Sequence, residues 1–148
     1  MKNWMIIFAL SLGFGSAFAQ KLKETEVPAI VKENFNKQFP NTKVDQWEKE
    51  GVNYEAEFHI NKVENSITFN ANGVMTEMET EIQVSELPKK VSEYVEKNLV
   101  GKKIKEASRI TDATGVGFYE AEIDGADYMF DDNGSFIKKK TEAKEDKK

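Results

Sequence analysis

A charged pentapeptide occurs twice in this chain of 148 residues, as YEAEF at residues 54–58 and as YEAEI at residues 119–123. In both copies apolar residues alternate with glutamates, which is the two-residue period of a β-strand with one buried face. Because such a strand returns within so short a chain, it indicates that one half of the chain repeats the design of the other.

The segments before these two strands also match each other. Apolar residues spaced four apart predict an amphipathic helix in residues 27–39 and another in residues 87–99. Each predicted helix has a proline in its first turn, Pro28 or Pro88, where the missing N–H is tolerated. The two prolines are 60 positions apart, and the two apolar stripes keep that spacing.

Each copy continues into short strands that end in a matched turn, FNANG at residues 69–73 and FDDNG at 130–134. Asn-Gly is typical of tight hairpins. Residues 74–84 then alternate strictly and connect the two copies. We therefore predict an α+β fold made by tandem duplication of a helix plus an antiparallel meander, with the two helices packed on one face of an antiparallel sheet. The uncovered face would carry the glutamates.

The N-terminal segment predicts export. Residues 1–19 contain one lysine, an apolar run and a small-residue A-x-A site, as in a cleaved signal peptide. The apolar run is shorter than a membrane-spanning helix needs, so we expect no membrane association after cleavage and a periplasmic or secreted protein. The predicted units are 1–19 as signal peptide, 20–84 as the first repeat, 85–138 as the second and 139–148 as a disordered charged tail.

The amino-acid composition argues against several classes of function. The chain has no cysteine, which excludes thiol catalysis and thiolate metal sites. Its net charge of −5 argues against binding nucleic acid or an anionic membrane. The single histidine, His59, stands in no hydrolase or zinc motif, so we predict that the protein is not an enzyme. A hydrolase remains an alternative that would need two carboxyls in a cleft.

Calcium is the cofactor that the sequence leaves open, and no other cofactor is expected. The densest acidic cluster surrounds the second Asn-Gly turn and offers the oxygen ligands that calcium prefers, although it lacks the spacing of an EF-hand loop. Its candidate ligands are Asp127, Asp131, Asp132 and Asn133. The alternative function is therefore a calcium-responsive periplasmic protein.

The order of the motifs resembles the PepSY-like family of exported bacterial proteins, which are similar in fold to the β-lactamase-inhibitor proteins. The resemblance covers about residues 27–138 and rests on the apolar-Pro, Y-E-A-E and F-x-x-N-G motifs, which are structural and not catalytic. It implies a tandem α+β module that acts outside the cytoplasm. By analogy of fold it also implies inhibitor-like binding through the open sheet face.

We therefore predict a non-catalytic binding module that contacts a protein or peptide through the open face of its sheet. The alternating glutamates are expected to point into water. Aromatic residues are expected in the core, and any that is exposed would anchor an interface. The residues predicted for contact are Trp47, Glu55, Glu57, Glu120 and Glu122.

Overall fold

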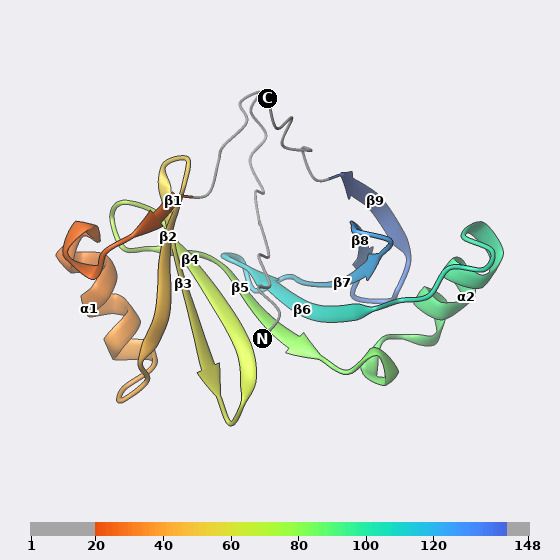
Figure 1. The fold of residues 1–148 in the computed structure, drawn as a ribbon, viewed down its shortest axis with the longest axis horizontal. Helices are drawn as coiled ribbons and strands as arrows, with labels where there is room; N and C mark the ends of the chain where they lie inside the picture. The colour runs from red at the N-terminus through yellow and green to blue at the C-terminus, as the bar shows by residue number, and fades with distance from the viewer. Residues whose placement is uncertain (1–19, 142–148) are drawn as a thin grey trace.

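The computed structural model describes residues 20–141 and shows two helices and one antiparallel sheet (Figure 1). The nine strands of the sheet lie in the order of the sequence, so that each pairs with its neighbours along the chain. The strands are β1 (Gln20–Leu22), β2 (Val44–Glu50), β3 (Asn53–Ile60), β4 (Val63–Phe69), β5 (Met75–Ile82), β6 (Glu106–Asp112), β7 (Gly117–Ile123), β8 (Ala126–Asp131) and β9 (Phe136–Thr141). The helices are α1 (Ala29–Gln38) and α2 (Lys89–Asn98), which follow the short 3-10 helices η1 (Glu24–Glu26) and η2 (Val84–Glu86).

Each helix begins directly after the proline that marks its first turn in the sequence. Pro28 and Pro88 are the N-cap residues, and their carbonyl oxygens accept hydrogen bonds from the N–H groups of Val31 and Val91. Both valines are fully buried, as the apolar stripes predict. Within residues 20–141, neither helix is long or apolar enough to cross a membrane.

Each helix covers a hydrophobic core of its own. Under α1, the ring of Phe35 meets the rings of Trp47 and Phe58 edge to face, with centroids 5.8 and 5.1 Å apart. Under α2, Tyr94 meets Phe130 in the same way at 5.5 Å. Edge-to-face contacts are favourable for buried aromatic rings. The predicted duplication is therefore present in the packing as well as in the element order.

Both cores lie on the same face of the sheet, as predicted. Strand β5 connects the two repeats, and on one of its faces Met78 packs in the first core while Ile82 packs in the second. The sheet is bent between them, so that β1 and β9 rise on opposite sides and the helices lie on the outside of the bend (Figure 1). The helix-free side is therefore concave, and we call it the open face.

Strand β9 differs from the prediction. It pairs with β8 as far as Thr141, so regular structure continues three residues into the segment 139–148 that was predicted to be disordered. Its lysines are accommodated because successive side chains point to opposite faces: Lys139 lies over the ring of Tyr128, and Lys140 reaches Glu120 on the other face. The rest of the predicted tail and the predicted signal peptide lie outside the described residues.

Two smaller features were also missed. Strand β1 pairs with β2, but three residues are too few for a periodic signal. In β5 the predicted strict alternation fails at its start, because a register shift beside Phe69 pairs that residue with Met75 and turns Met75 into the first core. From Glu77 onward the alternation holds, so Glu77 and Glu79 belong to the open face.

Candidate functional site

The open face of the first repeat is rich in glutamates, which include Glu64 on β4 and Glu81 on β5. The strand register places Glu48 opposite Glu55, and it connects Glu55 to Glu77 through Thr68 on β4. The period of two adds the remaining members on the same strands. We call this set the glutamate cluster, and its members are Glu48, Glu50, Glu55, Glu57, Glu77 and Glu79.

Most of the glutamate cluster is buried. Glu48 and Glu55 are 1% exposed and Glu79 is 4% exposed, while Glu57 is half-buried. The prediction that Glu55 and Glu120 point into water is therefore wrong, since Glu120 is also buried at 5% exposure. They lie on the predicted face, but that face is the concave side of the bent sheet (Figure 1). A strand pattern alone carries no information about that curvature.

Burial changes the proton affinity of these carboxyls. It raises the pKa of Glu55 to about 9, and the charge of Glu50 adds to the effect. Burial also raises the pKa of Glu57 to about 7, with a further contribution from Glu48. For Glu79 burial, followed by the charge of Glu120, raises the pKa well above its ordinary value. Burial therefore favours the protonated form of Glu55 in the folded protein.

Hydrogen bonding within the glutamate cluster is incomplete. Gln46 donates its Nε2 to Glu48 Oε1, but Glu48 Oε2 and Glu55 Oε2 have no hydrogen-bond partner among residues 20–141. Both carboxyl oxygens of Glu79 also lack a hydrogen-bond partner within this range. The Ser108 hydroxyl lowers the pKa of Glu79, but it does not reach normal hydrogen-bond geometry. An unpaired buried polar atom costs about 1–3 kcal/mol of stability. The cluster therefore has unused capacity to accept N–H donors.

The second repeat has different side chains at the six matching positions. Taken in order, they are Ser108, Ile110, Glu120, Glu122, Lys138 and Lys140. Lys140 Nζ lies 3.2 Å from Glu120 Oε2, and both side chains are mostly buried. In the second repeat a lysine of the last strand thus forms an ion pair with the buried glutamate of the pentapeptide.

A small apolar cluster lies beside this ion pair. Ile110 and Met129 are buried on the open face, and Phe118 packs against them. The open face therefore has an acidic half in the first repeat and a half with apolar and charged side chains in the second.

Two residues considered in the sequence have other environments. Trp47 is buried in the core under α1, so it lies on the helix side of the sheet and not on the open face, where contact was predicted. His59 is exposed, and its Nδ1 lies 2.7 Å from Asp45 Oδ2. That hydrogen bond raises the pKa of His59. Glu122, like Glu57, is half-buried on the open face.

The calcium candidates do not converge on one point. Asp131 Oδ1 accepts hydrogen bonds from the N–H groups of Asn133 and Ser135, which close its own turn at 2.9 and 2.7 Å. Asp132 pairs with Arg109 at 2.6 Å, and Asp127 lies on β8 opposite Glu122. Within the part of the chain that the structure describes, no group of three acidic or histidine side chains has the spacing of a metal site. Calcium binding stays a prediction.

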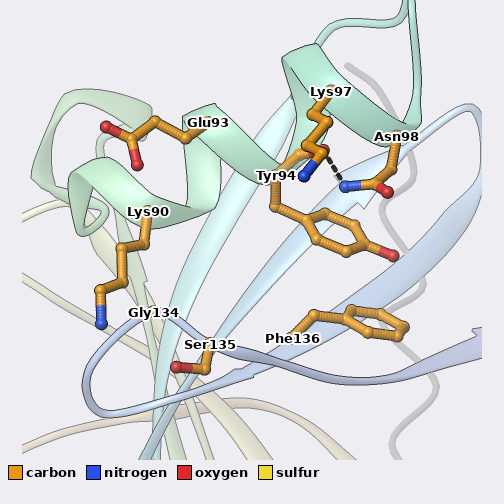
Figure 2. Close-up of a pocket in the computed structure, with 8 residues that line it drawn as sticks. All are labelled: Lys90, Glu93, Tyr94, Lys97, Asn98, Gly134, Ser135 and Phe136. Atoms are coloured by element: carbon orange, nitrogen blue, oxygen red, sulfur yellow. Dashed lines mark hydrogen bonds between the residues drawn. The ribbon is translucent and has the colours of Figure 1, made fainter.

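A groove of about 400 Å³ lies on the helix side, between α2 and the turn after β8 (Figure 2). Its floor is Tyr94 stacked on Phe136 with ring centroids 4.6 Å apart, and charged residues of α2 form its rim. In the first repeat Asn34 stands at the position of Tyr94, and its Nδ2 donates to the Gly73 carbonyl at 2.8 Å. The groove lacks the convergent polar groups of a ligand pocket, so the open face is the stronger candidate.

Comparisons with known proteins agree with the motifs. The family model described as "Putative beta-lactamase-inhibitor-like, PepSY-like" matches the chain twice, over residues 17–64 and 52–138. This confirms the resemblance seen in the sequence, and two matches of one family model across residues 17–138 agree with a tandem repeat. No curated protein matches the chain in sequence.

Solved structures share the fold at low identity. A BLIP-like protein from Bacteroides fragilis is 20% identical, with 82% of this chain and 91% of that chain covered and a TM-score of 0.63. A "putative periplasmic" protein from Bacteroides eggerthii is 14% identical, with coverages of 77% and 88% and a TM-score of 0.68. A protein from Bacteroides uniformis is 17% identical, with coverages of 76% and 88% and a TM-score of 0.68. Such identities establish the fold alone.

Proposed function

The chain belongs to the PepSY-like family, and from this premise we propose that it is an exported, non-catalytic module that binds a protein or peptide through its open face. The signal-peptide pattern in residues 1–19 supports export, as does the similarity to a solved protein described as periplasmic. The family description names an inhibitor-like protein and no reaction, which supports binding over turnover.

The observation that carries this proposal is the burial of incompletely paired glutamates on the face that no helix covers. Burial of Glu48, Glu55 and Glu79 opposes folding, because their carboxyls lose water without gaining a full set of partners. An apolar side chain at any of these places would pack without that penalty. A binding role accounts for the glutamates, whereas a purely structural role does not.

The edges of the sheet favour contact through the face and not through strand addition. Strand β1 has only three residues, and β9 carries the successive lysines Lys138, Lys139 and Lys140. Short or lysine-rich edge strands discourage pairing with another chain. A partner is therefore expected to contact side chains of the open face.

Site-specific photo-crosslinking in the producing bacterium tests the proposal. A photoreactive amino acid is placed at Glu57 or Glu122 on the open face, and at Glu33 or Glu96 on the helices as matched controls. We expect adducts of higher mass from the open-face positions only, with the partner identified by mass spectrometry. Adducts from the helix positions alone would contradict the proposal.

A further inference from the structure

The two repeats treat the buried glutamate of the pentapeptide differently. In the second repeat Glu120 has an ionic partner, Lys140 of the last strand, at 3.2 Å. In the first repeat Glu55 takes the place of Glu120, and Glu79 takes the place of Lys140. A carboxyl therefore stands where the second repeat has an ammonium group.

The strand register shows that the two places are geometrically equivalent. Glu79 is separated from Glu55 by strand β4, and Lys140 is separated from Glu120 by strand β8, with the same two-residue offset in the pairing. Both pairs follow a register shift beside the matched phenylalanines of the Asn-Gly turns. The difference between the repeats is therefore one of side-chain chemistry and not of backbone position.

Several carboxyl oxygens of the first repeat have no hydrogen-bond donor at this place among the described residues. Neither oxygen of Glu79 has a hydrogen-bond partner within residues 20–141, although the side chain is 4% exposed. Glu55 Oε2 and Glu48 Oε2 are also buried without a hydrogen-bond partner in the same range. A lysine ammonium has three N–H donors on a flexible stem, and one such group could satisfy oxygens on several strands.

We propose that the glutamate cluster is a subsite for the side chain of a lysine in the partner, whose ammonium group pairs with Glu55 and Glu79 as Lys140 pairs with Glu120 in the second repeat. This rests on the proposed function of the open face and names the chemistry of the partner. The neighbouring apolar cluster of Ile110, Phe118 and Met129 accepts an apolar residue adjacent to that lysine. The partner is a segment with a lysine beside apolar residues.

A divalent cation is the competing occupant of an acidic cluster. It would need several carboxylates within bonding distance of one point, and no group of three with that spacing exists among the described residues. An ammonium group tolerates more dispersed acceptors, because each of its donors makes a separate hydrogen bond. The geometry therefore favours lysine over a metal ion.

The test uses the chain from Gln20 to Lys148 and a capped peptide, Ala-Leu-Lys-Leu-Ala, titrated by NMR at low salt. The control peptide has acetyl-lysine at the centre, which keeps the shape and removes the charge. We expect the lysine peptide to shift amides of β3, β4 and β5, and Glu79→Gln to weaken binding by at least about tenfold. Glu96→Gln on α2 is the same substitution at an exposed position away from the open face, and it should leave the affinity unchanged.

A second variant copies the second repeat into the first. Glu79→Lys places an ammonium group beside Glu55, so it should raise the melting temperature and abolish binding of the lysine peptide. If Glu79→Lys lowers the melting temperature and binding persists, the subsite assignment is overturned.

The remaining outcomes separate this inference from the proposed function. Equal binding by the original protein and Glu79→Gln, with shifts still on the open face, rejects the lysine subsite but keeps the binding face. Shifts confined to the helices reject both. Absence of binding by the lysine peptide, or the same amide shifts with calcium chloride alone, also rejects the lysine subsite.

Discussion

The two repeats share a scaffold but differ in the side chains on their open faces. The capping prolines, the buried residues of the helices and the Asn-Gly turns occupy matching positions in both. On the open face, by contrast, six glutamates in the first repeat correspond to serine, isoleucine, two glutamates and two lysines in the second. The positions that build the fold are thus alike, and the positions that differ lie on the face that no helix covers.

The helix side shows a smaller difference of the same kind. Asn34 links α1 to its turn by a hydrogen bond to Gly73, whereas Tyr94 and Phe136 line a groove beside α2 (Figure 2). Neither change alters the path of the backbone. Substitution of matched residues in the two repeats can therefore separate the scaffold from the surfaces that it carries.

The largest expected effect tests whether the scaffold is shared. Phe69 and Phe130 precede the two turns at matching positions, and both are fully buried. Phe69→Ala and Phe130→Ala should each lower the free energy of unfolding by about 3–5 kcal/mol, because each leaves a cavity in its core. Urea denaturation measures both. A loss below about 1 kcal/mol for either variant would show that the repeats do not contribute alike.

The next largest effect is a change of stability with pH. The pKa of Glu55 is raised by burial to about 9, and burial followed by a hydrogen bond that protonated Glu106 donates to Glu122 raises the pKa of Glu106 to about 8. In the unfolded chain these carboxyls titrate near 4.5. Between those pH values the folded protein binds more protons, so stability is greatest on the acid side and falls as the pH rises.

The measurement is a thermal melt at about pH 5, 7 and 9, with an expected decrease of more than about 10 °C across the series. Glu55→Gln removes one of the titrating groups and should flatten the decrease, while Glu96→Gln serves as the exposed control. A melting temperature that is constant or rises with pH would contradict the burial of these carboxyls.

A moderate effect is expected from the ion pair of the second repeat. Lys140→Met leaves Glu120 without its cation, and the stability should fall by about 1–3 kcal/mol at alkaline pH. The loss should be smaller at acid pH, because burial raises the pKa of Glu120 to about 7 and its protonated form has no charge to pair. Denaturation at both pH values checks this, and an equal loss at each would show that packing and not charge is responsible.

The smallest effect is expected from calcium. Asp131 is occupied by the N–H groups of its own turn and Asp132 by Arg109, so millimolar calcium should shift the melting temperature by less than about 1 °C relative to EDTA. The double variant Asp131→Asn, Asp132→Asn is the control. A shift of several degrees that the double variant removes would support the calcium-responsive alternative.

The sequence by itself was sufficient for the duplication, the two helices, most strands and the family. These features depend on local signals: a spacing of four along a helix, a period of two along a strand, and proline or Asn-Gly at the ends. It also assigned Glu55, Glu57, Glu120 and Glu122 to the open face, because the face of a strand follows from the period alone. These signals depend only on residues close together in the sequence, so they can be recognised without knowledge of the tertiary structure.

Only the tertiary structure decided how deeply those glutamates are buried and what they meet. The burial of Glu55 depends on the bend of a sheet whose strands come from the whole chain, and the partner of Glu120 is Lys140 from an edge strand. The bulge that turns Met75 into the core arises from its pairing with β4. Curvature and cross-strand pairing are properties of several strands together, so no single stretch of sequence encodes them.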